Sequence, residues 1–138
     1  MSMALKDDIE KELEERDFNA RSIMNIIKYS LNGIASYAKE GKSIIIYLIG
    51  VIIETILGFV YHVNGLEWIL IICILGFILA IELVNTGIEK ACDAITKEYN
   101  PLIKIAKDCG SAATFVVFIV AIILNIIIFA PKIVALFL

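Results

Sequence analysis

The apolar residues of this chain are gathered into long runs rather than spaced at a helical or strand period. Three of these runs, 43–61, 66–85 and 110–130, approach the roughly 20 residues that a helix needs to cross a bilayer. The composition agrees, because 60% of the 138 residues are apolar. The pattern predicts an all-α membrane protein in which residues 1–138 form a single integral membrane domain with three transmembrane helices.

Residues 1–42 precede the first run and have a different pattern. Residues 5–20 are rich in Asp, Glu and Lys, and we expect a helical lead-in without chemistry of its own. From Arg21 onward, apolar side chains share one helical face and polar side chains the other, which is typical of an amphipathic helix lying on the membrane surface. A helix packed against soluble protein is disfavoured, because the chain offers no soluble core. The apolar face consists of Ile23, Ile26, Ile27, Leu31, Ile34, Tyr37 and Ala38.

The segment Glu40-Gly41-Lys42 is expected to be the hinge into the first span. Gly41-Lys42-Ser43 resembles the end of a phosphate-binding P-loop, but that motif needs a preceding strand and a glycine at position 36, where the chain has Ser36. A P-loop is therefore excluded.

Gly50, Glu54 and Gly58 share one face of the first span. Small residues allow another helix to approach closely, so this face is expected to meet protein rather than lipid. Glu54 lies near mid-membrane by count. A structural role, with the carboxyl protonated or hydrogen-bonded to another helix, is favoured over a role in a functional site.

The connections between the spans also have signals. His62-Val63-Asn64-Gly65 predicts a tight turn, because Asn-Gly is a turn signal, and Trp68 is expected to be an interfacial anchor. The second helix should continue into water through Ala94. Asn100-Pro101 predicts a helix cap followed by proline at the first helical position, and this last helix should end around Ala130-Pro131.

Four polar side chains follow the second apolar run at helical spacing: Glu82, Asn85, Glu89 and Asp93. On an α-helix they fall within about 80° of one another along about 16 Å. A generic stripe of this kind is a solvated helix face. Here Glu82 continues the apolar run without a break, and a carboxylate costs about 2.5–3.5 kcal/mol at the centre of a membrane helix, so intramembrane acids usually mark a function. Oxygen ligands at a membrane surface suit Mg²⁺ and its phosphates.

Charge and cysteine usage narrow the possible partners. A net charge of −3 is too slight to indicate nucleic-acid binding. Cys73, Cys92 and Cys109 form no Cys-x-x-Cys pair, which argues against disulfides and a metal–thiolate site. The turn at 62–65 has no Lys or Arg, so the positive-inside rule places the amino terminus and the polar stripe in the cytoplasm, with Lys132 as a minor exception. The orienting basic residues are Arg21, Lys28, Lys39, Lys42, Lys90, Lys97, Lys104 and Lys107.

The stripe also carries a resemblance. Glu-(x)2-Asn-(x)3-Glu-(x)3-Asp from Glu82 to Asp93, then Glu98-Tyr99, then Ala-Lys-Asp-x-Gly-Ser-Ala-Ala over 106–113, resembles the prokaryotic diacylglycerol kinase/undecaprenol kinase family. The resemblance implies a lipid kinase of phospholipid metabolism, a transferase in the bacterial inner membrane that uses ATP and Mg²⁺. It also implies a homotrimer with active sites between subunits.

The resemblance implies roles for individual residues. Glu82 would be the base for the lipid hydroxyl, and Glu89 would bind the metal. The family's second metal-binding glutamate falls on Gly41 when positions are counted without a gap from Gly33, and a one-residue shift in the hinge restores Glu40 as that ligand. The nucleotide-binding candidates are Asn85, Asp93, Lys107, Asp108 and Arg21, and the lipid-binding candidates are Glu82 and Ser111.

The sequence indicates the identity of the lipid substrate less directly than it indicates the kinase family. The diacylglycerol-specific branch of the family carries another acid after the hinge glutamate, where this chain has Ile44-Ile45-Ile46-Tyr47. That difference and the isoleucine-rich composition favour undecaprenol over diacylglycerol. The competing class is a non-catalytic oligomeric scaffold, or a small pore lined by Glu54 and Glu82. A pore would conduct ions without ATP turnover, whereas a kinase would label an extracted lipid with phosphate.

Overall fold

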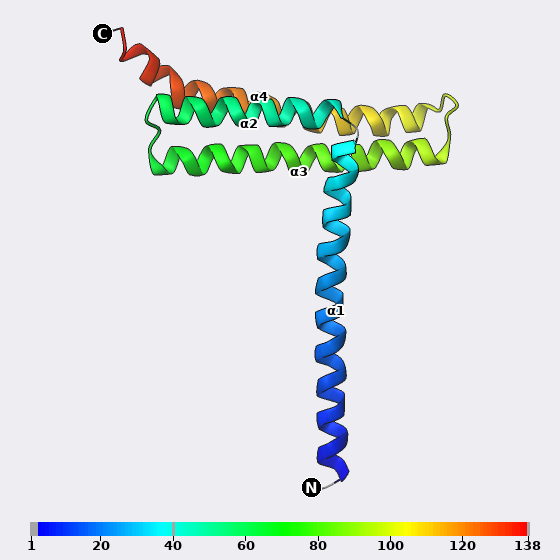
Figure 1. Ribbon diagram of the computed structural model, residues 1–138. Coiled ribbons are helices and arrows are strands. Elements are labelled where there is room, and N and C mark those ends of the chain that lie inside the picture. The colour runs from blue at the N-terminus through cyan, green and yellow to red at the C-terminus, as the bar shows by residue number, and fades with distance from the viewer. Residues whose placement is uncertain (1–2, 40, 138) are drawn as a thin grey trace. The chain divides into compact units, whose positions relative to one another are not determined.

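The computed structural model describes the backbone of residues 3–39 and 41–137 and the side chains of residues 21–39, 41 and 43–137. These residues form four α-helices, α1 (Met3–Lys39), α2 (Lys42–Val60), α3 (Gly65–Ile95) and α4 (Pro101–Val134) (Figure 1). No strand occurs in the described backbone, so the predicted all-α class is confirmed. The chain divides into two compact units, one containing α1 and the other containing α2, α3 and α4.

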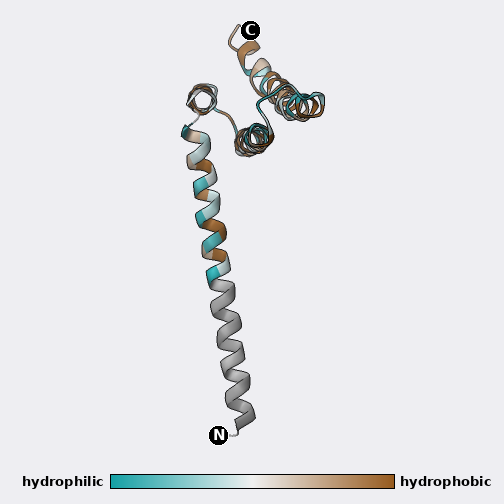
Figure 2. Ribbon diagram, turned by 90° about the vertical axis from the view of Figure 1, so that its right-hand side faces the viewer, coloured by the Kyte–Doolittle hydropathy of each residue, from teal (hydrophilic) through white to brown (hydrophobic). Residues whose placement is uncertain are grey.

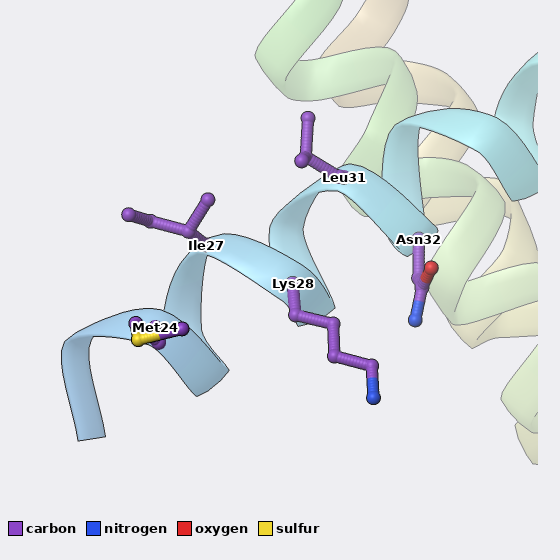
Figure 3. A pocket seen from close by; sticks show the side chains of 5 residues that line it. All are labelled: Met24, Ile27, Lys28, Leu31 and Asn32. Atoms are coloured by element: carbon purple, nitrogen blue, oxygen red, sulfur yellow. The ribbon is translucent and has the colours of Figure 1, made fainter. Parts of the chain in front are cut away.

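Helix α1 is continuous over 37 residues, so the charged lead-in and the expected surface helix are one element. Polar and apolar positions alternate along its described part (Figure 2). Ile27 and Leu31 extend from one side of the helix, and Lys28 and Asn32 extend from the other (Figure 3). This arrangement agrees with the helical spacing of the sequence, and the placement of α1 on a membrane surface stays a prediction.

The expected hinge is a break between helices. Helix α1 ends at Lys39, and Gly41 has φ +80°, a conformation that residues with a side chain rarely adopt. Glycine at this position therefore allows the chain to leave one helix and begin the next. Glu40, the predicted second metal ligand, lies outside the described residues.

Helices α2, α3 and α4 are each long and apolar enough to cross a membrane. Figure 2 looks along them and shows α3 lying between α2 and α4. Helices α3 and α4 contain 31 and 34 residues, which correspond to about 46 Å and 51 Å, whereas the hydrocarbon layer is about 30 Å thick. Both helices are therefore longer than the membrane is thick, and part of each must extend beyond the hydrocarbon.

The packing of α3 against α4 follows a seven-residue repeat. The repeat brings the same face of each helix to its partner at every second turn, as in a coiled coil. Asn85 occupies the α3 position midway between two buried members of the repeat, so an amide lies in line with the apolar members of α3. We call this set the α3–α4 seam; its buried members are Ile71, Ile78 and Cys92 in α3 and Thr114, Ala121 and Ile128 in α4.

One end of the seam is closed by an apolar cluster of Val63, Ile71, Ile128 and Phe129. The ring of Tyr61 at the end of α2 lies 5.9 Å from the ring of Phe129, edge to face. This cluster joins all three apolar helices at the end opposite to the polar stripe.

Gly58 of α2 is also buried near this end. A Cβ atom there would overlap the indole of Trp68, so the small residue serves contact with α3. The prediction that this face meets protein is confirmed at Gly58, and Trp68, the expected interfacial anchor, packs on α2. Within the described residues, a Cβ atom at Gly50 would meet nothing within 4 Å.

The predicted tight turn between α2 and α3 is present, but Asn64-Gly65 does not form its centre. Asn64 is the N-cap of α3 rather than the centre of an Asn-Gly turn, and its Oδ1 accepts the N–H groups of Leu66 and Glu67, each at 3.0 Å. Glu67 Oε2 accepts the N–H of Asn64 at 2.7 Å and completes a capping box. The same carboxylate lies 3.0 Å from the Lys132 ammonium of α4.

Helix α4 begins as predicted, with Asn100 as N-cap and Pro101 in the first turn. The predicted end at Ala130-Pro131 was wrong, because the helix continues through Pro131 to Val134. Proline has a backbone angle compatible with a helix and removes a single hydrogen bond, so one proline bends a helix without necessarily ending it. The last turns bend away from the rest of α4 (Figure 1).

Candidate functional site

The predicted polar stripe lies on α3, which is helical without a break from Gly65 to Ile95. Glu82, Asn85, Glu89 and Asp93 therefore share one side of the helix, as their spacing predicts. Glu82 and Asn85 are half-buried, and Glu89 and Asp93 are exposed. The stripe thus runs from a partly enclosed carboxylate to an open one.

Asn85 connects the stripe to the α3–α4 seam. Its Nδ2 donates a hydrogen bond to Glu89 Oε1 at 3.2 Å. Its Oδ1 is buried and has no hydrogen-bond partner among the described residues. A buried acceptor without a donor is unfavourable by about 1–3 kcal/mol, so the amide is held in this position at a cost to the stability of the helix pair.

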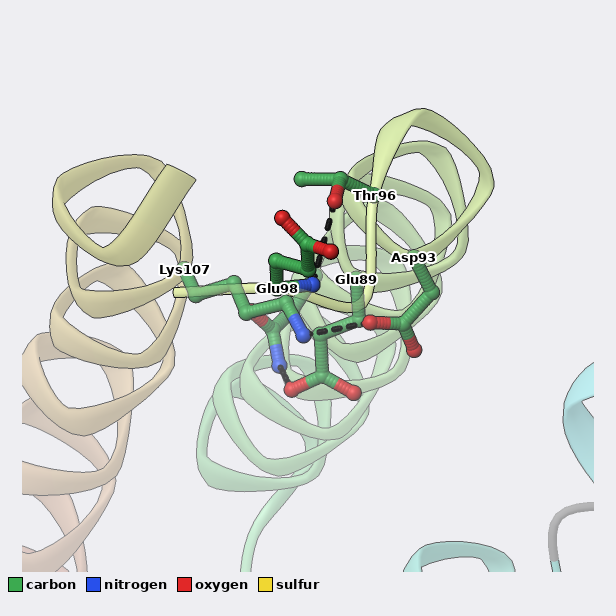
Figure 4. Close-up of polar contacts among 6 residues, drawn as sticks. Glu89, Asp93, Thr96, Glu98 and Lys107 are labelled. Carbon is green, nitrogen blue, oxygen red and sulfur yellow. Dashed lines mark hydrogen bonds and ion pairs between the residues drawn. The ribbon is translucent and has the colours of Figure 1, made fainter. Parts of the chain in front are cut away.

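Asp93 and Lys107 join the ends of α3 and α4. The Lys107 ammonium lies 2.5 Å from Asp93 Oδ1 across the two helices (Figure 4). Both residues are outside the predicted spans 66–85 and 110–130. The hydrogen bond from Lys107 lowers the pKa of Asp93, and the same bond raises the pKa of Lys107. The structure therefore places the lysine, in its charged form, at the open end of the stripe.

Asp108 and Ser111, the other candidates on α4, are not part of this contact. Asp108 lies 3.4 Å from the ammonium of Lys104, one turn earlier on the same helix, and both side chains are exposed. Ser111 is exposed one turn beyond Lys107. Within this chain, Lys107 therefore contacts α3, whereas the neighbouring Asp108 contacts only its own helix.

The short loop after α3 holds these helix ends together. Thr96 Oγ1 accepts the backbone N–H of Glu98 at 3.0 Å (Figure 4). Asn100 Oδ1 then accepts the N–H of Leu102 at 2.9 Å as α4 begins. Glu98 and Tyr99 are exposed in this loop, beside the site. Side-chain caps thus fix a short connection where the Asp93–Lys107 pair forms.

The remaining candidates belong to other parts of the chain. Arg21 is in α1, which is a separate unit. Among the described residues, no group of three or more His, Cys, Asp or Glu side chains could hold a metal ion by itself. Mg²⁺ usually takes one or two carboxylates and completes its shell with phosphate oxygens and water. Glu89, an exposed carboxylate of the stripe, fits that manner of binding better than an all-protein cage would.

Comparisons with known proteins agree with this arrangement. The family model for prokaryotic diacylglycerol kinase matches residues 28–129. The chain is 38% identical over 77 residues to the undecaprenol kinase of Bacillus subtilis, an alignment that covers 56% of this chain and 63% of that relative. It is 36% identical over 97 residues to the diacylglycerol kinase of Pseudomonas aeruginosa, covering 70% of this chain and 78% of the relative.

The diacylglycerol kinase of Escherichia coli is 30% identical over 115 residues, covering 76% of this chain and 88% of that relative. Three apolar helices with an acidic stripe at one end, together with these matches, define a lipid kinase of the membrane. The chain belongs to the prokaryotic diacylglycerol kinase family.

Gly110 is a residue of the site that the sequence alone did not indicate. This residue of α4 is buried against Asn85, and a Cβ atom on it would overlap Asn85 Oδ1. Two sequence signals were available: the glycine directly precedes Ser111 in the Lys-Asp-x-Gly-Ser motif, and Asn85 falls on the seven-residue repeat of α3. Neither signal identifies the contact until the two helices are placed in register.

Proposed function

We propose that this chain transfers the terminal phosphoryl group of ATP, with Mg²⁺, to the hydroxyl group of a membrane lipid alcohol. The observation that carries the proposal is the α3 stripe with Lys107 held against its open end by Asp93. Phosphoryl transfer requires positioning, neutralisation of phosphate charge and a group that receives the proton of the attacking hydroxyl. The stripe and the lysine offer side chains for each of these tasks.

Glu82 is proposed as the base. It is the deepest and most enclosed acid of the stripe, so it is placed to reach a hydroxyl that cannot leave the bilayer. As the lipid oxygen bonds to the terminal phosphorus, the bond between that phosphorus and the bridging oxygen of ADP breaks. The Glu82 carboxylate receives the hydroxyl proton. Ser111 on α4 is proposed to bind the lipid head together with Glu82.

Glu89 and Glu40 are proposed to hold Mg²⁺, which would neutralise charge on the phosphate oxygens. Lys107 would bind a phosphate oxygen while it remains in contact with Asp93, because one ammonium group has three donors. The amide of Asn85 would contact phosphate from beside Glu89. Asp93, Asp108 and Arg21 are proposed to complete the nucleotide site.

A homotrimer with sites between subunits is proposed because the candidate residues of one chain do not all face the same site. Asp108 is paired with Lys104 on its own helix rather than facing the stripe. Large apolar side chains along α2 are also exposed, including Ile45, Ile49, Ile52 and Ile56. A neighbouring copy would cover part of this surface and present its own polar residues to the stripe. Chemical cross-linking in native membranes tests the subunit number.

The site is proposed to face the cytoplasm, where ATP is available. The basic residues between the predicted second and third spans support this orientation through the positive-inside rule. Lys132, the minor exception in the sequence, is paired with Glu67 at 3.0 Å, so its charge is balanced locally. The surface helix around residues 21–39 is proposed to lie on the same side, with its apolar face in the lipid.

Undecaprenol is proposed as the preferred acceptor over diacylglycerol. The likeness to the Bacillus subtilis undecaprenol kinase supports this preference, as does the apolar segment from Ile44 to Tyr47 where the other branch carries an acid. Both lipids present a hydroxyl at the membrane surface, so the chemistry of the stripe is the same for either acceptor.

The test is transfer of labelled phosphate from Mg-ATP to each lipid, measured side by side with purified protein in vesicles. Glu82→Gln and Glu89→Gln should abolish labelling of both lipids. Glu12→Gln, in the lead-in to which no chemistry is assigned, is the control for loss of one carboxylate and should label lipid normally. Wild-type protein that labels neither lipid contradicts the proposed function. Faster labelling of diacylglycerol contradicts the acceptor preference alone.

A further inference from the structure

We propose that Gly110 is a positioning residue of the kinase site, because its lack of a side chain lets α4 seat the amide of Asn85, which in turn holds Glu89. This inference rests on the proposed function for its kinetic consequence. The contact itself is a property of the fold. Gly110 is buried on the α4 face that packs against α3.

The contact leaves no room for a side chain. A Cβ atom at Gly110 would overlap Oδ1 of Asn85, and it would also lie 3.4 Å from Cγ of Asn85 and 3.6 Å from Cδ1 of Ile88. The asparagine side chain has only two rotatable bonds, so its oxygen retreats only if the whole amide turns. A larger residue at position 110 must therefore displace either Asn85 or the helix that carries it.

The two ends of the amide have different tasks. Nδ2 of Asn85 donates to Glu89 Oε1 at 3.2 Å, while Oδ1 faces Gly110 without a hydrogen-bond partner among the described residues. The opposite amide orientation would bring Oδ1 against the Glu89 carboxylate, which is repulsive. The contact with Glu89 thus determines which atom meets Gly110.

The seam limits the alternatives open to Asn85. The residue lies on the seven-residue repeat midway between the buried Ile78 and Cys92, so turning it outward would leave a gap in the helix contact. The facing turn of α4 is also held, because the Thr114 hydroxyl donates to the carbonyl of Gly110 at 3.4 Å. A change at Gly110 is therefore transmitted to Asn85 and from Asn85 to the Glu89 carboxylate.

The first experiment compares Gly110→Ala with Gly87→Ala in the full-length protein. Both substitutions add one methyl group to a helix interior and bring the same gain in helix preference. The added Cβ atom overlaps Asn85 in the first variant and meets nothing within 4 Å in the second. Gly110→Ala should lower kcat about tenfold to a hundredfold and raise the KM for Mg-ATP, since displacement by about 1 Å near a reacting group has effects of this size. Gly87→Ala should stay within about twofold of wild type, and the KM for lipid should be unchanged in both.

The second experiment is a double-mutant cycle with Asn85→Ala, which removes the atom that Gly110 accommodates. If Gly110 acts through Asn85, adding Gly110→Ala to Asn85→Ala should bring no further loss of kcat. If Gly110→Ala lowers kcat as much in the Asn85→Ala protein as in the wild type, the proposal is overturned, because the glycine would then act only by setting the distance between the helices. A Gly110→Ala variant that behaves like Gly87→Ala would overturn it as well.

The wild type, the two single variants and the double variant also test the contact between Gly110 and Asn85 through their stability, without reference to activity. Their thermal midpoints should show the same coupling, with Gly110→Ala destabilising the wild type and not the Asn85→Ala protein. Should Gly110→Ala not fold, the double variant should fold, and its failure to do so contradicts the proposal. A wild type without lipid labelling refutes the proposed function and leaves the coupling of the thermal midpoints as the test of the contact.

Discussion

The two ends of the α3–α4 pair each join the helices with one carboxylate and one lysine, yet the surroundings differ. Glu67 and Lys132 lie 3.0 Å apart with 22% and 23% of their side chains exposed, whereas Asp93 and Lys107 lie 2.5 Å apart with 54% and 39% exposed. Glu67 also caps α3 through the N–H of Asn64. The same kind of ion pair is thus committed to structure at one end and open to an incoming anion at the other.

The seam shows the same division. At one end it contains Ile71, Ile128 and Phe129, all buried and apolar. At the other it contains Asn85 against Gly110, with an acceptor that has no donor among the described residues. A stable apolar end can support an unsatisfied polar end, because the packing that holds the helices together does not depend on the polar contacts. Each prediction below assigns an effect to one end and not to the other.

The largest effect is expected at the polar end, on activity. Replacing Glu89 by glutamine keeps the size of the side chain and removes its charge. Because a metal ion contributes several kcal/mol to stabilising transferred charge, kcat should fall by at least about a thousandfold, or about 4 kcal/mol. The measurement is labelled-phosphate transfer at saturating lipid. Thermal stability should change little, and a parallel loss of both would remove the distinction between the two ends.

The next effect is expected at the apolar end, on stability. Ile128→Ala removes a buried side chain from the cluster with Val63, Ile71 and Phe129, and losses of this type are about 2–5 kcal/mol. Unfolding in increasing denaturing detergent measures the loss, and kcat per folded molecule should remain that of wild type. Ile127→Ala, an exposed neighbour on the same helix, is the matched control.

A smaller effect is expected for the ion pair at this end. Glu67→Ala removes both the capping contact and the pair, whereas Lys132→Met removes the pair alone. The first variant should lower the thermal midpoint by a few degrees and the second by less, because the cap remains. Equal shifts would show that the ion pair, not the cap, accounts for the effect.

The smallest effect is the pH dependence of the exposed pair at the polar end. Because the pKa of Asp93 is lowered and the pKa of Lys107 is raised, the pair stabilises the fold fully between the ordinary pKa values of the two groups, about 4 and about 10. The contribution is lost as pH falls through the pKa of Asp93 or rises through that of Lys107. The difference in thermal midpoint between wild type and Asp93→Asn should follow this window and shrink in high salt, as expected for exposed charges.

Local pattern was sufficient for much of this molecule. The three apolar helices, the cap at Asn100 and the common face of Glu82 and Glu89 follow from run length, capping residues and the period of one helix. Contacts between helices do not follow from that information. They depend on which residue lies opposite which, and this register is set by packing along the whole seam.

Four positions illustrate this limit of local pattern. Asn64 is a helix cap because Glu67 completes the box, Gly58 accommodates Trp68, and Gly110 accommodates Asn85. The helix continues through Pro131, just after the buried residues Ile128 and Phe129. The roles of individual site residues and the homotrimer stay predictions, since they concern contacts with ligands and with other subunits.

Pro131 has a consequence for the depth of the protein in its bilayer. Proline has no N–H, so the carbonyl oxygen of Ile127 lacks its usual helical donor, and an unpaired carbonyl in hydrocarbon costs on the order of several kcal/mol. In a membrane, that turn is stable only where water, a neighbouring helix or a polar side chain supplies a donor. From Lys107 to Pro131 the helix rises about 36 Å, slightly more than the hydrocarbon thickness of about 30 Å. In the proposed kinase, inserting one helical turn between these two residues would therefore shift Lys107 by about 5 Å relative to the turn at Pro131.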